Sequence, residues 1–372
     1  DRVNFWRDIV SEPLYEQCLK ARAGDVVTVD LATNQVVPGY QEKLIRRLKT
    51  SQFRNEMFDG GALSGPRFGR FYPQGLLSGV TNVFSQNMTP FRCVGTTESG
   101  FLGDLNHPMA GRQLQLKAEI IDIREKFEER GGTSTDWLEL LLSGPGMQAR
   151  WRAEPTDFFY GSPFDRKDAA DDALFYQAPR FVHHLDQTAV GVITDLYGRL
   201  LKPGMRVLDL MSSWVSHLPE AVSYQMVTGL GMNAAELSAN GRLSDHLVHD
   251  LNQNPALPFD TEAYDAVICT ASVEYLTSPL AVFAEVRRIL ASGGIFAVTF
   301  SNRWFEPKTI RLWTELHEFE RIGLVIEYFL QAGGFEDLET YSIQGLPRPE
   351  DDKYFPQMLT ADPVFAVWGR KR

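Results

Sequence analysis

Three polar side chains in the C-terminal half of the chain follow apolar segments. Asp209 lies near the end of the apolar segment 207–210, Asp250 closes the second predicted strand after it, and Ser272 follows the apolar residues in 264–269. Apolar runs of this length predict buried strands, and nucleotide-containing ligands bind where the carboxyl ends of parallel strands meet. Carboxylates and a hydroxyl at that edge can hydrogen-bond an ammonium group, an amine and a ribose. The pattern therefore predicts a nucleotide-binding site.

The residues after Asp209 are unusual for a tight turn beside a nucleotide. Asp209 itself can accept hydrogen bonds from the turn amides and face a ligand ammonium group, directly or through water. Ser212 and Ser213 supply hydroxyl donors, and Trp214 supplies a bulky ring. Either the backbone approaches the ligand less closely here than a glycine turn would, or hydroxyls replace backbone amides. The Trp214 ring can equally belong to the core.

Residues 175–186 precede these strands and would lie over the same edge of the sheet as a lid. Within them, Arg180 can bind a ligand carboxylate through two parallel hydrogen bonds. His183 or His184 can serve as a general base, with His217 as a third candidate, although a lone histidine is more often structural. No metal site is predicted, because His183 and His184 are sequence neighbours rather than partners four residues apart on a helix.

The order of these motifs resembles class I S-adenosylmethionine (SAM)-dependent methyltransferases, of the type 11-like group. The resemblance covers residues 180–372 and includes the Gly-Gly turn at 293–294 before a buried strand. It implies SAM as the cofactor and an α/β fold with a Rossmann-like, seven-stranded sheet. Two departures are clear. Residues 211–214 replace the family's glycine triplet after the first strand, and Gly231 stands where the family has an acidic residue.

The departures change which residues can hold the ribose and the adenine. Because Gly231 has no side chain, Asn233 is the nearest polar group able to bind the ribose diol, and Met232 can pack on the adenine. The alternative for Asn233 is a helix N-cap. By resemblance to the family, Asp250 accepts the adenine amine and Leu251 lies beside the ring.

The residues after the fourth strand occupy the position from which methyltransferases address the transferred methyl group and its acceptor. Ser272 is a cofactor-binding candidate there, and Glu274 or Tyr275 can orient the nucleophile. The alternative for Glu274 is a solvated surface side chain. Methyl transfer from a sulfonium mainly requires alignment of donor and acceptor in a water-poor site, so little acid–base machinery is obligatory.

The N-terminal part carries a second resemblance. Residues 103–112, followed by an alternating strand at 114–123, are similar to the end of bacterial FKBP-type prolyl isomerases with an inserted flap. Residues 36–44 match their Pro-Gly turn into a central helix. The segment between Leu31 and Val36, which would carry their phenylalanine–aspartate pair, is nearly absent.

This second resemblance implies a smaller, degenerate FKBP-like α+β domain over residues 23–126. An amphipathic helical segment at 1–22 precedes it, and a linker and lid region at 127–179 follows it. Several aromatic residues either line a remnant of the isomerase pocket or form an ordinary core, and the second alternative is favoured. They are Tyr40, Phe68, Phe71 and Phe91.

The absence of an obvious catalytic dyad favours an acceptor that ionises easily, such as a thiol or sulfide. The segment from Asp209 to Pro219 and the FKBP-like front also resemble bacterial hydrogen sulfide and methanethiol S-methyltransferases. Two alternatives stay open. One is an FKBP-like client-binding or prolyl isomerase protein with a cofactor-poor methyltransferase fold, and the other is a protein methyltransferase.

Composition narrows the partners. A net charge of −11 over 372 residues disfavours nucleic acid and anionic membranes, which select basic surfaces, and favours a small-molecule or a protein substrate, of which we expect a small molecule. The cysteines Cys18, Cys93 and Cys269 have no CxxC spacing, so we expect neither a disulfide framework nor a cysteine zinc site, and a reducing cytoplasm is the expected location. No apolar run is long enough to cross a bilayer, and the sequence leaves a homo-oligomer open.

Overall fold

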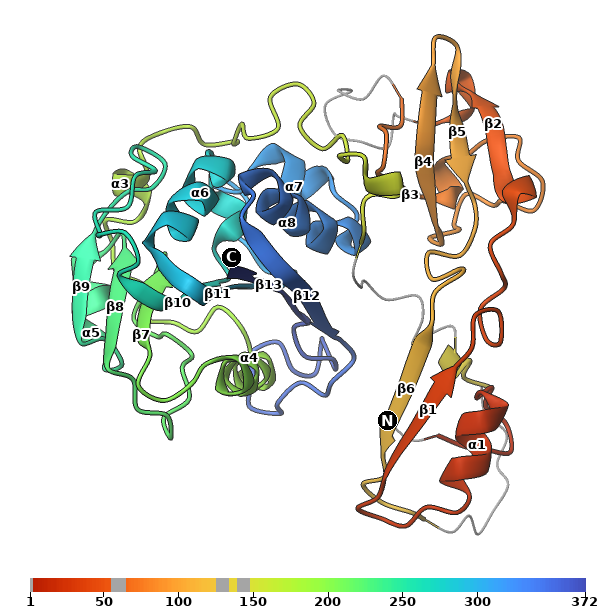
Figure 1. Ribbon diagram of the computed structural model, residues 1–372, viewed down its shortest axis with the longest axis horizontal. Coiled ribbons are helices and arrows are strands. Elements are labelled where there is room, and N and C mark those ends of the chain that lie inside the picture. Colours follow the sequence, from red (N-terminus) through yellow and green to blue (C-terminus); the bar gives the residue numbers. More distant parts are fainter. Residues whose placement is uncertain (1–2, 55–64, 125–133, 139–147) are drawn as a thin grey trace. The chain divides into compact units, whose positions relative to one another are not determined.

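The computed structural model describes residues 3–54, 65–124, 134–138 and 148–372. The chain divides into two compact units, Asp1–Gly144 and Pro145–Arg372 (Figure 1). Each unit is described by itself.

The N-terminal unit contains a two-stranded antiparallel sheet under a short helix. Strand β1 (Val26–Leu31) pairs with β6 (Leu114–Glu119), and alternate residues of β1 are buried. Helix α1 (Glu12–Cys18) contributes Leu14 to the same hydrophobic cluster. Within the amphipathic segment predicted at 1–22, the structure has one α-helix, Glu12–Cys18. The strand predicted at 114–123 is shorter than expected and ends at Glu119.

A second sheet in this unit has four antiparallel strands in the order β2-β5-β4-β3. Their bounds are Ile45–Lys49, Gly100–Asp104, Pro90–Thr97 and Phe71–Pro73. The rings of Phe53, Tyr72, Phe91 and Phe101 form its core, with centroids 5.1 to 6.5 Å apart.

Two expectations from the FKBP resemblance bear on this unit. The helix expected after residues 36–39 is a single 3-10 turn, Glu42–Leu44, that leads directly into β2. Of the proposed pocket residues, Phe91 is fully buried in the aromatic core and Tyr40 is 39% exposed. Core packing therefore accounts for Phe91, and the FKBP resemblance stays a prediction from the sequence.

The C-terminal unit is built on the predicted seven-stranded sheet, in the order β12-β13-β11-β10-β7-β8-β9 (Figure 1). Strands β9, β8, β7, β10 and β11 run parallel, and β13 runs antiparallel between β11 and β12. In chain order from β7 to β13 the strands are Arg206–Leu210, Met226–Gly231, Asp245–Val248, Tyr264–Thr270, Leu290–Phe300, Phe335–Ile343 and Val364–Lys371.

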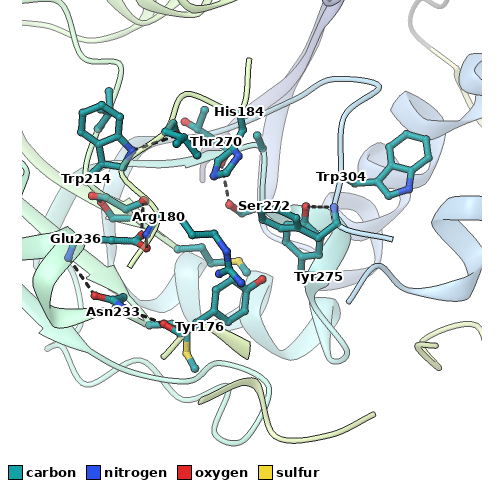
Figure 2. A pocket seen from close by; sticks show the side chains of 18 of the residues that line it. Tyr176, Arg180, His184, Trp214, Asn233, Glu236, Thr270, Ser272, Tyr275 and Trp304 are labelled. Atoms are coloured by element: carbon teal, nitrogen blue, oxygen red, sulfur yellow. Dashed lines mark hydrogen bonds between the residues drawn. The ribbon is translucent and has the colours of Figure 1, made fainter. Parts of the chain in front are cut away.

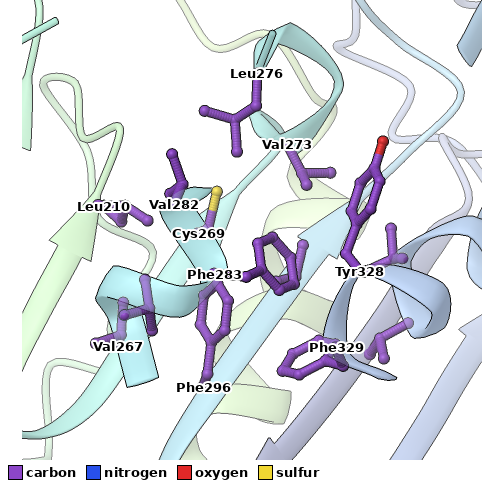
Figure 3. Packing of buried hydrophobic residues seen from close by; sticks show 14 of the residues in the cluster. Leu210, Val267, Cys269, Val273, Leu276, Val282, Phe283, Phe296, Tyr328 and Phe329 are labelled. Carbon is purple, nitrogen blue, oxygen red and sulfur yellow. The ribbon is translucent and has the colours of Figure 1, made fainter. Parts of the chain in front are cut away.

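Helices cover both faces of this sheet because successive strand residues point to opposite sides. Val267 of β10 and Phe296 of β11 join a cluster with Phe283 and Phe329, whereas Ile268 joins the cluster on the other face (Figure 3). The first cluster holds α6 (Pro279–Ile289) and α8 (Glu318–Ala332), and the second holds α4 (Gln187–Leu200). The shorter helices are α3 (Asp172–Phe175), α5 (Ala234–Ala239) and α7 (Arg311–Glu315).

The sequence places the start of the catalytic domain at residue 180, but the compact unit begins earlier. Phe158 belongs to the main core cluster, and Arg166 forms an isolated β-bridge with Ile310. Residues 148–179 therefore pack as part of this unit rather than as a separate linker. In the linker region predicted at 127–179, residues 137–138 are helical, and residues 127–133 and 139–147 lie outside the described residues. No helix in the described ranges is long and apolar enough to span a membrane.

Candidate functional site

A cavity of about 580 Å³ opens at the carboxyl edge of the parallel strands. Its walls come from the segments after β7, β8, β9, β10 and β11, together with the lid and residues 353–354 (Figure 2). All but one of the site residues predicted from the sequence line it. Those that do are Arg180, His183, His184, Asp209, Ser212, Ser213, Trp214, Met232, Asn233, Asp250, Leu251, Ser272 and Tyr275.

Asp209 lines the cavity and is only 2% exposed. Ser212 donates a hydrogen bond from its Oγ to Asp209 Oδ2 at 2.6 Å. Burial in low-dielectric surroundings disfavours the charged carboxylate and raises the pKa of Asp209 to about 7. A cationic group entering the cavity would reverse this effect, because an opposite charge favours ionisation.

The backbone is strained at the same edge. Met211 (φ 60°), His217 (φ 53°) and Ala271 (φ 47°) are non-glycine residues in the left-handed region, and all three line the cavity. Such residues cost energy and concentrate at functional sites. Burial lowers the pKa of His217 to about 4, so this histidine is neutral at neutral pH.

The loss of the glycine triplet at residues 211–214 and the glycine at position 231 have one structural cause. The turn after β7 folds over the end of β8, where the Ser212 amide donates to the Leu230 carbonyl at 2.8 Å. A Cβ on Gly231 would lie 2.1 Å from the Ser212 carbonyl oxygen, a distance that real atoms do not adopt. The acidic residue expected at this position is therefore excluded by the turn that replaces the glycine triplet.

Asn233 is the N-cap of α5, the alternative weighed from the sequence. Its Oδ1 accepts from the backbone amides of Ala235 and Glu236, and its Nδ2 donates to the carbonyls of Tyr176 and Gln177. An asparagine side chain has two donors and two acceptor sites, so all four are in use. The prediction that Asn233 binds the ribose is corrected: it caps the helix and holds the lid.

Glu236 is a cavity residue that the sequence analysis missed. Its Oε2 accepts from Ser213 Oγ at 2.6 Å, and its Oε1 accepts from the backbone amide of Arg180 at 2.7 Å (Figure 2). The only local signal is its position three residues after the N-cap Asn233, which normally indicates a capping box. No such box forms, because the carboxylate is turned toward the turn after β7 and the lid.

Asp250 follows β9 and presents one unused acceptor. Its Oδ1 accepts from the backbone amides of Asn252 and Gln253. Its Oδ2 is buried and has no hydrogen-bond partner within the described residues. A buried acceptor without a partner is costly, so a ligand donor in the cavity would satisfy it. Leu251 is 3% exposed and supplies apolar surface next to it.

The lid carries Arg180 on a stack of aromatic rings. Its guanidinium carbon lies 4.5 Å from the Phe175 ring centroid and 5.5 Å from that of Phe305. Its Nη2 donates to the Phe175 carbonyl at 2.9 Å. His184 meets the Phe305 ring edge-on with centroids 5.0 Å apart, and burial lowers its pKa below 6.5. His184 is therefore neutral at pH 7 and able to accept a proton. His183 lies against Trp214, with ring centroids 4.7 Å apart.

The residues after β10 point in different directions. Tyr275 lines the cavity, accepts a hydrogen bond from the Phe305 amide at 2.8 Å, and stacks on the Phe305 ring. Ser272 donates from its Oγ to the Thr270 carbonyl at 2.9 Å. Glu274 is 1% exposed and does not line the cavity, and neither carboxyl oxygen has a hydrogen-bond partner in the described part.

Both sequence alternatives for Glu274 are therefore corrected: it is neither an acceptor-orienting residue of the cavity nor a solvated side chain. The 3-10 turn Val273–Tyr275 buries it in the apolar interior. Burial raises its pKa to about 8, so the group is mostly protonated at neutral pH.

Ion pairs around the buried Lys308 hold the segment that precedes the lid. Lys308 is fully buried, and its Nζ lies 3.1 Å from Asp172 Oδ1 and 3.0 Å from Asp168 Oδ2. Asn252, beside Asp250, donates to Asp172 Oδ2 at 2.8 Å. The sequence carries no signal for this network, because its members are far apart along the chain. Groups of three or more metal-ligating side chains are absent from the described part of the chain.

The side chains of the cavity match the chemistry of SAM. The unused Oδ2 of Asp250 can accept from an adenine amine, and buried Asp209 can face an ammonium group. The guanidinium of Arg180 has no carboxylate partner within the described residues and can bind one. The volume also lies within the range of sites for ligands of this size, about 300–1,000 Å³.

Comparison with known proteins agrees with this site. Residues 213–298 match a sequence family described as methyltransferase domain. A sterol 24-C-methyltransferase, ERG6B of Gibberella zeae, is 28% identical over 242 residues, covering 57% of this chain and 58% of that protein. The chain thus spans little more than half the length of this curated relative.

Solved structures give only partial overlaps. One is a complex between the Haloferax volcanii Trm112 methyltransferase activator and a putative methyltransferase, with 20% identity, a TM-score of 0.37, and coverage of 49% of this chain and 90% of that chain. Another is Haemonchus contortus phosphoethanolamine N-methyltransferase 2 in complex with SAM, with 14% identity, a TM-score of 0.35, and coverage of 50% and 52%. At these scores they add nothing to the argument.

The family match falls on the segment that runs from the turn after β7 to β11, and it includes most of the cavity-lining residues of the sheet edge. SAM is the cofactor of domains of this class. Residues 213–298 of the unit Pro145–Arg372 therefore belong to a methyltransferase domain, and the strand order and the cavity at the carboxyl edge agree with the Rossmann-like fold of SAM-dependent methyltransferases.

Proposed function

We propose that the protein transfers the methyl group of SAM to a small thiol or sulfide, such as hydrogen sulfide or methanethiol. The observation that carries the proposal is the juxtaposition of two kinds of group in one cavity. Asp209 and Asp250 can hold the cofactor, and His184 and Tyr275 stand at the same edge with little further acid–base machinery. Bound SAM supplies an electrophilic methyl group, and a thiolate is a strong nucleophile that needs only a weak base.

Each residue then has a defined task. Asp209 binds the cofactor ammonium group, and the unused Oδ2 of Asp250 accepts a hydrogen from the adenine amine. Arg180 binds the cofactor carboxylate. Neutral His184 accepts the proton of the entering thiol, and burial keeps the pKa of the Tyr275 phenol far above its ordinary value, so that ring stays uncharged and excludes water.

The cofactor part of this proposal is tested by calorimetric titration with SAM and with its demethylated product, S-adenosylhomocysteine. We expect Asp209→Ala and Asp250→Ala each to weaken binding by about 1–3 kcal/mol, through lost hydrogen bonds to charged or buried groups. Unchanged affinity in both variants would show that the cofactor is placed wrongly.

The acceptor part is tested by turnover with hydrosulfide, methanethiol and a panel of larger thiols, with methylated product measured directly. Oxygen and nitrogen nucleophiles of similar size serve as matched controls. The proposal requires turnover with at least one small thiol and much slower turnover with the controls. Turnover confined to the oxygen or nitrogen acceptors would overturn the choice of a sulfur nucleophile.

We propose that the N-terminal unit is a degenerate FKBP-like module, on the basis of the resemblance in its sequence. Phe91 and Tyr72 pack within its aromatic core, which favours a recruiting or docking role over an open isomerase pocket. A proline-containing peptide assay tests this, and isomerisation at the rate of an active FKBP enzyme would contradict the degenerate form.

A further inference from the structure

At the end of β8 the cofactor site lacks a side chain that can accept hydrogen bonds from the ribose hydroxyls. A ribose diol consists of two hydroxyl donors, and nucleotide-binding sheets commonly meet it with a carboxylate near the end of the second strand. Here a side chain at Gly231 would collide with the Ser212 carbonyl, and all four hydrogen-bonding positions of Asn233 are taken. Neither residue can receive the diol.

Glu236 follows Gly231 by five residues, and its carboxylate is held between the turn after β7 and the lid. It lines the cavity, is partly buried, and comes from the first turn of α5 (Figure 2). Its neighbours Ser213 and Arg180 approach with a hydroxyl and a backbone amide, one to each carboxylate oxygen. A carboxylate offers about four acceptor positions, so each oxygen keeps one free.

The charge around Glu236 also favours a ligand that donates hydrogen bonds. Within the described residues its carboxylate forms no ion pair, and both of its partners are neutral groups. The two bonds fix the orientation of the carboxylate between the turn after β7 and the lid. A fixed carboxylate without a cation binds a pair of neutral hydroxyl donors well, since such charge-assisted hydrogen bonds are stronger than neutral ones.

We propose that Glu236 binds the ribose hydroxyls of the cofactor, in place of the side chain that Gly231 cannot carry. The inference rests on the proposed function only in requiring that the cavity binds SAM. The acceptor for the diol is thereby moved from the end of β8 to the first turn of α5. Ser213 acts as a positioning residue that holds the carboxylate in place.

The test is a binding cycle that pairs the Glu236→Gln variant with ligands lacking one ribose hydroxyl. Dissociation constants are measured by calorimetry for S-adenosylhomocysteine and for its 2′-deoxy and 3′-deoxy analogues. In the wild-type protein we expect loss of a contacted hydroxyl to weaken binding about 10- to 100-fold, as for a hydrogen bond to a charged group. In Glu236→Gln the same deletion should cost less than about 3-fold.

Ser213→Ala is the matched control, because it removes a bond to Glu236 Oε2 but keeps the carboxylate. It should weaken S-adenosylhomocysteine moderately and retain most of the discrimination against the deoxy analogues. If Glu236 only ties the lid to α5, Glu236→Gln would weaken all three ligands equally and leave the discrimination at the wild-type value. That result would overturn the proposal.

The outcomes also separate this inference from the proposed function. A wild-type protein that binds S-adenosylhomocysteine but discriminates the analogues no better than Glu236→Gln would refute the role of Glu236 alone. A wild-type protein that binds none of the three ligands would refute the proposed function, and this inference with it. Thermal unfolding of both variants checks that the fold is retained.

Discussion

Asp209 and Glu274 are two buried carboxyl groups whose pKa values burial raises, to about 7 and about 8. Their surroundings differ. Asp209 accepts a hydrogen bond from Ser212 and lines the cavity, whereas the carboxyl group of Glu274 has no hydrogen-bond partner in the described part and Glu274 does not line the cavity. We therefore expect Asp209 to ionise when a cation enters the cavity, and Glu274 to stay mostly protonated at neutral pH.

For Asp209, SAM binding should be coupled to loss of a proton. The free protein holds this carboxyl partly protonated near pH 7, and the cofactor ammonium group favours the charged form. Affinity should therefore rise with pH and level off above about 7, falling by up to about tenfold per pH unit below it. Calorimetry in buffers of different ionisation enthalpy should show proton release that Asp209→Asn abolishes. Equal proton release in the variant would assign the effect to another group.

For Glu274, we expect the free energy of unfolding itself to depend on pH. Its folded pKa of about 8 lies above the ordinary value of 4.5, so its contribution to stability is fully present below about 4.5 and is lost as pH rises toward 8. The loss approaches about 1.4 kcal/mol per pH unit. Glu274→Gln should lack this slope and gain stability relative to the wild type between about pH 5 and pH 8. Denaturant unfolding at several pH values measures it, and parallel curves would contradict the burial argument.

Among the secondary-structure elements, α5 and the lid are joined by hydrogen bonds of one side chain, that of Asn233. Asn233 caps the helix with its oxygen and binds the lid carbonyls of Tyr176 and Gln177 with its nitrogen. The lid in turn carries Arg180, and Lys308 secures the segment before it through Asp172. Helix capping and closure of the cavity thus depend on the same loop after β8.

Two substitutions at Asn233 should separate these effects. Serine keeps a cap but is too short to reach the lid carbonyls, whereas alanine loses both. We expect Asn233→Ser to be about 1 kcal/mol more stable than Asn233→Ala. Both should weaken SAM binding to a similar degree, because both release the lid. If binding instead follows helix stability, so that the serine variant binds like the wild type, the lid bonds have no role in cofactor retention.

At the scale of the whole molecule, each compact unit has its own hydrophobic core. The clusters around Phe91 and around Leu14 belong to the N-terminal unit, and the two clusters on the faces of the seven-stranded sheet belong to the C-terminal unit. All candidate cofactor-binding residues lie in the second of these units.

Calorimetric melting of the full chain should therefore show ligand stabilisation of one unit only. Saturating S-adenosylhomocysteine adds about 2.7 kcal/mol to the unit that binds it at 100 times the dissociation constant. We expect the transition of Pro145–Arg372 to move upward and the other to stay in place. Near-ultraviolet circular dichroism can assign the transitions, since the units have different aromatic clusters. Equal shifts of both transitions would show that the units unfold together.

Local patterns in the sequence are enough to predict the strands and the edge of the sheet at which the site forms. Strands such as Tyr264–Thr270 are marked by local apolar runs, and the polar residues that follow them must meet where parallel strands end. Asp209, Asp250, Ser272 and Tyr275 therefore reach the same cavity as predicted. Even the exclusion of an acidic side chain at position 231 is visible in the sequence as a glycine, although its cause is not.

Which polar groups are free to bind a ligand depends on how distant segments of the chain pack together. The lid partners of the Asn233 side chain lie 56 and 57 residues away, those of the Glu236 carboxylate lie 23 and 56 residues away, and the clash that requires Gly231 comes from Ser212. Local patterns set backbone conformation, whereas hydrogen-bond partners and burial depend on segments brought together by packing. For the same reason the sequence could not show that Glu274 lies in the interior while its neighbour Tyr275 reaches the cavity.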